Sequence, residues 1–229
     1  PEMIRLWKDD LREKNYAPST INTYLAALNG FFRFCGWADC RARFLKIQRR
    51  LFRDSKQGLT RAEYECLVAA AEAAGDHGLA LLMETICSTG IRVSEVQYIT
   101  VEAAKNGKTE IALKGKIRTI LLPSKLCRKL LKFAARQKTA SGAIFRTKSG
   151  KALSRYQIWL KMKKLCARAG VDAEKVFPHN LRHLFATAFY RAYKDIVKLA
   201  DVLGHSSIET TRIYLVTSAA EHRRQLERL

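Results

Sequence analysis

The sequence HNLRHLFATAFYRAY, at residues 179–193, carries the strongest structural signal in this chain. Its apolar residues recur at helical spacing and predict a helix over residues 180–193. The predicted buried stripe consists of Leu181, Leu184, Phe185, Ala188 and Phe189. His179, Arg182 and His183 flank that stripe, and His179 and Arg182 are three residues apart, so both can address one point. The stretch therefore predicts a packed helix with a group of polar side chains at its start.

Histidines four residues apart can also indicate a metal site. His179, however, is not followed by the Glu of the zinc motif His-Glu-x-x-His, and Arg182 would place a positive charge beside the ion. The six cysteines include no Cys-x-x-Cys pair. They are expected to be buried or reduced thiols, and neither a metal nor another cofactor is expected.

The elements around this helix predict a mainly α fold with a small antiparallel β-sheet. Alternating residues 109–113 and the apolar run 117–122 flank Lys114-Gly115-Lys116 and predict a hairpin with a basic tip. Thr60 and Glu63 have the spacing of a capping box. The other helices are predicted at residues 61–74, 79–87, 124–137, 154–169, 196–203 and 207–215, with a last amphipathic stretch to residue 229.

The N-terminal part predicts a small separate domain. Helices are expected at residues 2–14, from Pro18 onward and at 38–47, followed by a polar linker that ends at Gly58. We therefore assign residues 1–58 to a helical domain with a basic linker, and residues 59–229 to a second domain. Because the chain starts at Pro1 rather than Met, the first domain is expected to be truncated at its N-terminus.

The charge of the chain favours a polyanionic partner. The chain has 42 Lys and Arg against 21 Asp and Glu, a formal net charge of +21, and the excess is spread along the sequence. Interleaved apolar residues favour folded basic surfaces and duplex nucleic acid over a membrane surface. No apolar run is long enough for a membrane span, so a cytoplasmic protein is expected.

One basic run comprises Arg41, Arg43, Lys46, Arg49, Arg50, Arg53 and Lys56. This run is either a solvated surface or a linker that crosses a phosphate backbone.

Four motifs resemble those of the tyrosine recombinases, the phage and transposon integrase family. TGIRVSEV at residues 89–96 resembles the first arginine box, and HNLRH at 179–183 resembles the His-x-Leu-Arg-His box. Leu203-Gly204-His205 matches the Leu-Gly-His element, and Tyr214 stands nine residues further on, where the family has its nucleophile. The resemblance covers residues 59–217 and, more loosely, the N-terminal part. It implies a catalytic domain preceded by a SAM-like core-binding domain.

Transferred residue by residue, the resemblance implies a catalytic role for six side chains. Tyr214 would be the nucleophile, Arg92 and Arg182 would bind the scissile phosphate, and His205 would donate to the same group. His179 would manage the tyrosine proton, and Lys114 would be the general acid, with Lys116 as the alternative. Glu95 and His183 would support the arginines and the tyrosine. Singly, each residue also fits an ordinary structural role, such as a surface charge, a turn residue or a packed tyrosine.

These residue types suit phosphoryl transfer. Two guanidiniums can stabilise the charge that grows on the non-bridging oxygens, so no metal is required. A phenol has a pKa of about 10, so it needs a base and a positive field to act as a nucleophile. A covalent phosphotyrosine keeps the energy of the phosphodiester bond, and cutting and rejoining therefore need no ATP.

The resemblance also implies partners. Double-stranded recombination sites, a homotetramer on DNA and an accessory DNA-bending or excision factor are expected, in the integration and excision of a bacterial or phage mobile element. The tail from Thr217 to Leu229 is expected to dock on a neighbouring subunit, with packing on its own domain as the alternative. A type IB topoisomerase and a non-catalytic DNA-binding relative are the rival functions.

Overall fold

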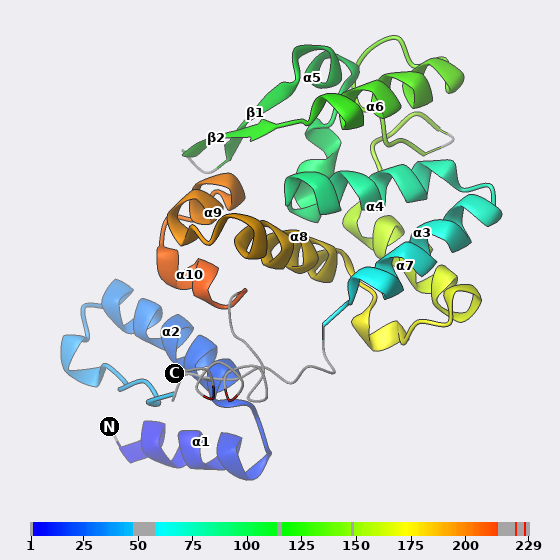
Figure 1. Cartoon of the computed structure of the whole chain (residues 1–229). Coiled ribbons are helices and arrows are strands. Elements are labelled where there is room, and N and C mark those ends of the chain that lie inside the picture. The colour runs from blue at the N-terminus through cyan, green and yellow to red at the C-terminus, as the bar shows by residue number, and fades with distance from the viewer. Residues whose placement is uncertain are drawn as a thin grey trace. The chain divides into compact units, whose positions relative to one another are not determined.

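The computed structural model describes residues 2–47, 58–113, 116–147 and 149–214, together with residues 223 and 227 (Figure 1). The chain divides into two compact units, Pro1–Leu51 and Phe52–Leu229. Residues 48–57, where the predicted linker falls, and most of the tail after Tyr214 lie outside the described residues.

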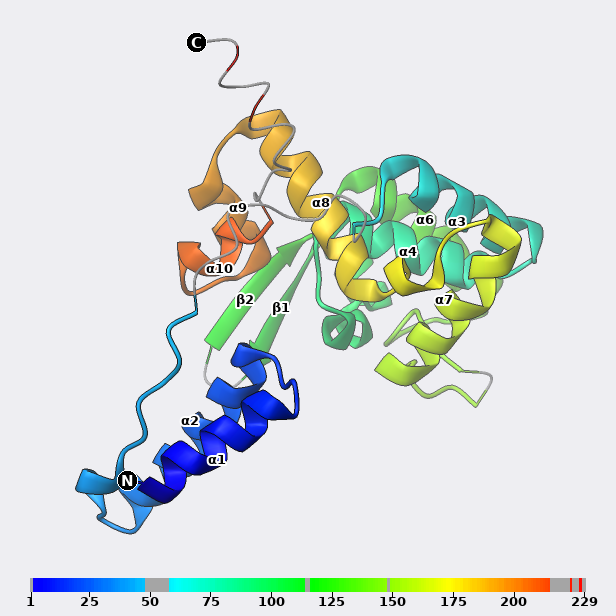
Figure 2. The same cartoon turned by 90° about the horizontal axis from the view of Figure 1, so that it is seen from below.

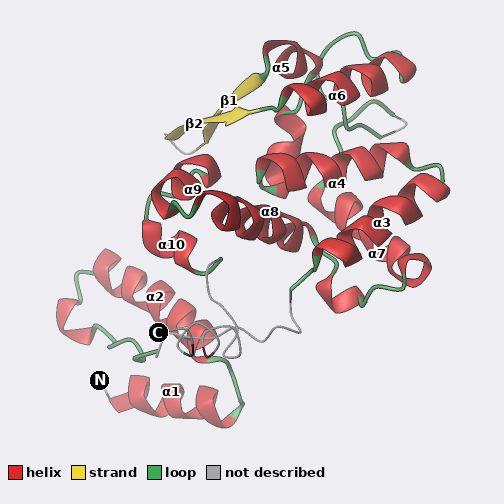
Figure 3. Ribbon diagram, in the orientation of Figure 1, coloured by secondary structure: helices red, strands yellow, loops and turns green. Residues whose placement is uncertain are grey.

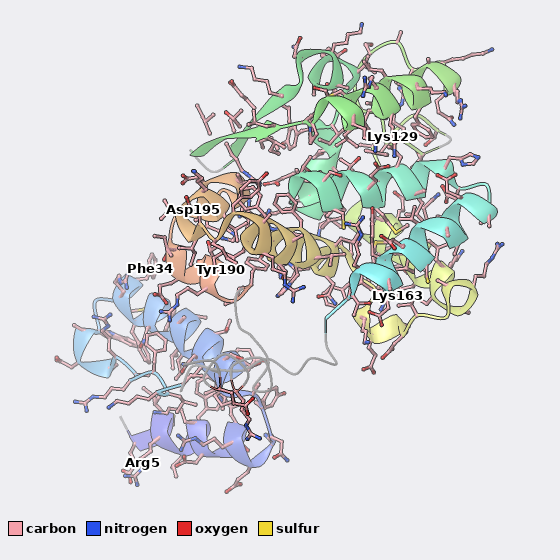
Figure 4. The ribbon with its side chains drawn as sticks, in the orientation of Figure 1. Arg5, Phe34, Lys129, Lys163, Tyr190 and Asp195 are labelled. Atoms are coloured by element: carbon pink, nitrogen blue, oxygen red, sulfur yellow. The ribbon has the colours of Figure 1, made fainter. Side chains whose placement is uncertain are left out.

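The N-terminal unit contains two helices, α1 (Glu2–Glu13) and α2 (Pro18–Phe34), and a 3₁₀ turn, η1 (Ala38–Cys40). Pro18 occupies the first turn of α2, where its missing N–H leaves no hydrogen bond unmade. The core is small: Leu11, Ile21, Leu25 and Ala42 are its buried apolar residues. Phe34, labelled in Figure 4, is 89% exposed.

The predicted third helix at residues 38–47 is wrong. Beyond η1, residues 41–47 form an extended segment, and two asparagines of α2 hold it in place. The side chain of Asn29 exchanges two hydrogen bonds with the backbone of Ala42 (3.0 and 2.8 Å), and that of Asn22 does the same with Leu45 (2.9 and 2.8 Å). Each amide side chain thus satisfies the donor and acceptor that a helix would otherwise pair.

The second unit confirms the predicted fold class, because its described part is helical except for one two-stranded antiparallel sheet (Figure 3). Its elements are α3 (Arg61–Ala73), α4 (His77–Thr89), η3 (Val93–Tyr98), α5 (Val101–Asn106), β1 (Lys108–Leu113), β2 (Lys116–Leu121), α6 (Ser124–Arg136), α7 (Arg155–Ala169), η4 (Ala173–Lys175), α8 (Pro178–Tyr193), α9 (Ile196–Leu203) and α10 (Ile208–Arg212). Within the described residues, no helix is long and apolar enough to cross a membrane.

Helix α4 is the centre of this unit. It contacts α3, α6, α7 and α8 (Figure 1), and most of its residues are buried, among them Leu82, Met83 and Ile86. The Asp76 side chain caps its start, and Gly90 ends it in the left-handed conformation. The helix is longer than the predicted 79–87, and its C-terminal end delivers the TGIRVSEV segment to the site described below.

Most of the other helix predictions are confirmed. The capping box of Thr60 and Glu63 starts α3, and α9 has the predicted bounds. Helix α10 ends at Arg212, earlier than predicted. The sequence analysis missed η3 and α5, two short elements of six residues each. In a segment this short the apolar period is incomplete, so no helical pattern is visible.

Helices α8, α9 and α10 enclose a second, smaller core in the same unit. Ala186, Leu199, Leu203 and Tyr214 are its buried residues. The predicted stripe on α8 is corrected at one position, because Ala186 is buried whereas Ala188 is exposed. Tyr214 follows α10 directly and enters this core, so the packing of three helices fixes its place.

Candidate active site

The residues singled out in the sequence come together from four segments of the second unit. Arg92 and Glu95 follow α4, whereas His179, Arg182 and His183 lie on α8. His205 follows α9, and Tyr214 follows α10. Figure 2 shows α8, α9 and α10 on the same side of the unit as the β1–β2 hairpin.

Arg92 is held by Glu95. The carboxylate of Glu95 accepts hydrogen bonds from the Arg92 backbone N–H (2.7 Å) and from Arg92 Nη1 (2.9 Å). Glu95 is only 2% exposed, while the Arg92 side chain remains 43% exposed. Burial alone would raise the pKa of Glu95, but the Arg92 N–H and the charge of Arg118 hold it below its ordinary value. Glu95 therefore stays ionised and orients a guanidinium that can still reach a ligand.

Arg182 is buried, with 2% of its surface exposed. It donates to two backbone carbonyls, from Nη1 to Gly90 and from Nη2 to Leu203 (2.8 Å). Burial lowers its pKa to about 10, and its interaction with the Tyr214 hydroxyl opposes that shift. The guanidinium remains charged at neutral pH and joins the end of α4 to the end of α9.

Position 90 requires a residue without a side chain. Its φ is +64°, and a Cβ there would lie 2.4 Å from the Phe185 ring and 2.9 Å from Leu203. A glycine is therefore required both for the left-handed turn and for the close approach of α4 to α8. The turn directs the Gly90 carbonyl to Arg182 and places Arg92 two residues further on.

His205 lies between Arg182 and Thr211. Arg182 Nη2 is 2.9 Å from His205 Nε2, and Thr211 Oγ1 is 2.8 Å from Nδ1. Because a guanidinium can only donate, Nε2 accepts here, and Nδ1 carries the proton and donates to Thr211. Burial, followed by the charges of Arg182 and Arg92, lowers the pKa of His205 to about 4. His205 is thus neutral at pH 7.

Tyr214 is buried among histidine rings, with 4% of its surface exposed. Its ring stacks on His205 with centroids 5.8 Å apart and an interplanar angle of 11°. His183 meets the ring edge-on at 5.0 Å, and the His179 ring lies 6.0 Å away. The three histidines and Arg182 therefore surround the one tyrosine that the sequence indicated as nucleophile.

The hairpin carries the two remaining candidates. Lys114 lies outside the described residues, and Lys116 is the first residue of β2, where only its backbone is described. Leu113 pairs with Lys116, and Ile111 pairs with Arg118. Arg118 was not among the predicted residues, yet its Nη1 donates to both oxygens of Glu95 (2.7 and 2.6 Å). Alternation could have revealed it, because Arg118 shares a strand face with the buried Ile120 and needs a partner there.

A pocket of about 290 Å³ lies beside Arg92, Arg118 and His205. Its lining includes the exposed Arg92, the half-buried His205, Ser206 and Thr210, together with Arg118 and Glu95. The exposed guanidinium of Arg92 and the hydroxyls of Ser206 and Thr210 can donate hydrogen bonds to a phosphate group at this concave surface. Among the described residues, no group of three or more His, Cys, Asp or Glu could hold a metal ion.

The basic residues of the N-terminal part are described only up to residue 47. Arg41, Arg43 and Lys46 are exposed on the extended segment that the asparagines hold. The rest of the run, Arg49, Arg50, Arg53 and Lys56, lies outside the described residues. The six cysteines are free thiols, of which Cys127 and Cys166 are buried and Cys66 is exposed.

Comparison with known proteins places the chain in a family. Residues 57–221 match the model of the phage integrase family. Over 229 residues the chain is 31% identical to the tyrosine recombinase XerA of Pyrococcus furiosus, and the match covers 95% of this chain and 77% of XerA. The chain therefore belongs to the phage integrase family of tyrosine recombinases. It is an enzyme of site-specific recombination, which breaks and rejoins DNA strands.

Solved structures support the fold. The chain resembles the XerH site-specific recombinase bound to a palindromic difH substrate in a post-cleavage complex, with a TM-score of 0.74 and 21% identity over 97% of this chain and 71% of that one. It also resembles the Tn1549 transposon integrase in complex with transposon right end DNA, with a TM-score of 0.73 and 18% identity over 99% and 84% of the two chains. At these identities the likeness extends to the fold alone.

Proposed function

We propose that Tyr214 attacks the scissile phosphodiester of double-stranded DNA while Arg92, Arg182 and His205 bind its non-bridging oxygens. The bond from the tyrosine oxygen to phosphorus forms as the bond from phosphorus to the 5′ oxygen breaks. Lys114 on the hairpin gives its proton to that leaving oxygen, and His179 takes up the tyrosine proton. The product is a 3′-phosphotyrosine and a free 5′-hydroxyl, and a 5′-hydroxyl of another strand reverses the step.

The convergence around Tyr214 carries this proposal. Segments 92–95, 179–183 and 203–214 are far apart in the sequence, yet Arg182 contacts Gly90, Leu203 and His205. The tyrosine stacks on the same His205. Donors arranged before the ligand arrives can stabilise developing charge without reorganising during the reaction.

The hydrogen bond from Arg182 to His205 has a consequence for phosphate binding. His205 Nε2 accepts from Arg182, so it cannot donate to a phosphate in this protonation state. A phosphate bound beside Arg182 takes over the Arg182 Nη2 donor, and its negative charge raises the pKa of the neighbouring imidazole. His205 then takes up a proton at Nε2 and donates it to the phosphate in a hydrogen bond.

In this proposal the basic residues of the N-terminal part and the hairpin contact the DNA backbone. The exposure of Arg41, Arg43 and Lys46 supports it, and the further residues proposed to make such contacts are Arg49, Arg50, Arg53, Lys56 and Lys116. Neutralising about 6 to 10 phosphates implies a loss of affinity of roughly 10³ to 10⁵ between about 50 and 200 mM salt. Titration of labelled duplex at several salt concentrations measures this slope. Activity that vanishes with EDTA would instead indicate a metal nuclease.

The active assembly is a homotetramer on two recombination sites, in the integration and excision of a mobile element in the bacterial or phage-infected cytoplasm. The tail after Tyr214 docks on a neighbouring subunit, and an accessory DNA-bending or excision factor sets the direction. Removing the residues after Ser218 then abolishes cooperative assembly in gel shifts while single-site cleavage persists. A truncated protein that loses its fold without a selective loss of assembly would place the tail on its own domain.

Strand exchange between two labelled duplexes tests the function as a whole. The target is first selected by sequencing the DNA that the protein retains covalently from a pool of random duplexes. The unchanged protein and Tyr193→Phe, a change on an exposed tyrosine of α8, then exchange strands between selected sites, whereas Tyr214→Phe does not. Relaxation of supercoiled DNA without exchange would indicate a topoisomerase, and binding without either activity a non-catalytic relative.

A further inference from the structure

We infer that Arg118 is a positioning residue that fastens the β1–β2 hairpin, and with it the general acid, to the phosphate-binding side chains. The inference rests on the proposed function, in which the hairpin supplies Lys114. It adds a role for a residue that neither touches the phosphate in the proposal nor belongs to the four motifs.

One guanidinium joins three segments of the unit. From β2, Arg118 Nη1 donates to both carboxylate oxygens of Glu95 in η3 (2.7 and 2.6 Å), and Nη2 donates to the carbonyl of Val202 in α9 (2.9 Å). Glu95 in turn holds Arg92, and Val202 is three residues from His205. One arginine side chain thereby joins the hairpin both to the segment that holds Arg92 and to the helix that precedes His205.

The surroundings of Arg118 leave its side chain little freedom. Only 11% of the side chain is exposed. A Cβ on Gly204, whose φ is +63°, would lie 2.4 Å from Arg118 Cδ and 2.5 Å from Nε. Gly204 of the Leu-Gly-His element therefore leaves the space through which Arg118 passes.

Stability alone does not account for a buried arginine here. Arg118 Nε is buried and has no hydrogen-bond partner, and burial lowers the pKa of Arg118 against the opposing charge of Glu95. A desolvated charge with an unpaired donor is unfavourable, and well-packed apolar residues often stabilise a fold at least as well as a buried ion pair. Directional bonds from a rigid fork, by contrast, fix a strand to its partners.

The strand register places the hydrogen bonds of Arg118 to Glu95 and Val202 close to the hairpin tip. Ile111 pairs with Arg118, and Leu113 pairs with Lys116, so only Lys114 and Gly115 join the strands. The inward face of β2 carries Arg118 and the buried Ile120, while Ile117 and Leu121 are 78% and 69% exposed. Arg118 is four positions after Lys114 in the sequence, so the bonds of Arg118 to Glu95 and Val202 hold the hairpin only a few residues from the proposed acid.

A leaving-group substitution tests the inference. Single-turnover cleavage is measured on the selected site with either oxygen or sulfur at the bridging 5′ position, since a sulfur leaving group needs no proton. Arg118→Met is expected to cut cleavage of the oxygen substrate by about 10²-fold, because a small misplacement of a catalytic group has effects of that size. The sulfur substrate is expected to restore most of the loss.

Matched variants separate the possible outcomes. Lys114→Ala should show the same rescue, and Arg92→Lys should show none. Arg128→Met, which removes an exposed arginine of α6, should cleave both substrates like the unchanged protein. Gly204→Ala keeps every charge, but its added Cβ displaces Arg118, so it should behave like Arg118→Met. If Arg118→Met does not fold, Gly204→Ala tests whether Arg118 positions the general acid.

Two results would have distinct meanings. Equal loss on both substrates in Arg118→Met and Gly204→Ala, with Lys114→Ala rescued, would overturn the inference and leave the proposed function intact. Absence of rescue in Lys114→Ala itself would overturn the assignment of the general acid in the proposed function.

Discussion

Arg92 and Arg182 serve the same candidate site from two regions that are built differently. On the hairpin side, Arg92 is 43% exposed and is oriented by the buried charge of Glu95. On the tyrosine side, Arg182 is 2% exposed and bonds to backbone carbonyls inside the packing of α8 and α9. One arginine is positioned by an ion pair and stays free to reach DNA, whereas the other is part of the fold. We therefore expect that a substitution of Arg92 can reduce catalysis without reducing stability. A substitution of Arg182 is expected to reduce both.

The largest expected effects come from substitution of Arg92 and Arg182, and they test this comparison directly. Arg92→Lys and Arg182→Lys each keep a charge but lose the bidentate fork, so both should reduce cleavage by about 10²-fold or more. Only Arg182→Lys should also lower the free energy of unfolding, by about 2 kcal/mol, because it leaves buried carbonyls unpaired. Cleavage rates and urea denaturation check the two effects. Equal losses of stability in both variants would contradict the comparison.

A smaller effect on stability is expected where Gly90 packs against Phe185 of α8. Gly90→Ala adds a Cβ that overlaps the Phe185 ring, whereas Gly170→Ala, at nearly the same φ of +62°, meets nothing within 4 Å. Both changes carry the strain of the left-handed conformation, about 1–2 kcal/mol, and Gly90→Ala adds about 1–3 kcal/mol of overpacking. Thermal denaturation of the two variants measures the difference. A Gly90→Ala protein as stable as Gly170→Ala would show that α4 and α8 separate easily.

The last effect, which is absent at neutral pH, is the pH dependence of stability. The pKa of His205 is about 4 in the folded protein, below the ordinary value of about 6.5, so between these values the unfolded chain binds a proton that the folded chain does not. Stability is therefore lost as the pH falls from about 6.5 toward 4. His205→Asn should therefore flatten the curve in this window. Glu95, whose pKa is lowered, adds a loss only below its ordinary range near pH 4.5. An unchanged curve in His205→Asn would mean that the imidazole is not held neutral.

The sequence predicted the fold class because the fold class depends on local signals, and it indicated the candidate residues through the resemblance of four motifs. The period of α8, the capping box at Thr60 and Glu63, and the spacing of the motifs are all visible in the chain itself. The helix predicted at 38–47 was wrong because Asn22 and Asn29 pair with that segment from a distance. Arg118 was missed for a similar reason, since its partners Glu95 and Val202 are 23 and 84 residues away. A side chain that bonds to backbone or charged groups far away in the sequence is not indicated by the pattern of its neighbouring residues.

Mapping of the covalent adduct tests the central claim most directly. The protein is incubated with the selected duplex carrying a nick next to the scissile phosphate, so that the released fragment diffuses away, and the adduct is digested for mass spectrometry. We predict a DNA 3′-phosphate bound to Tyr214, absent in Tyr214→Phe and retained in Tyr193→Phe. An adduct on Tyr193, on Tyr190 of α8 (Figure 4), or on any residue of the Tyr214→Phe protein would contradict the assignment of Tyr214 as the nucleophile.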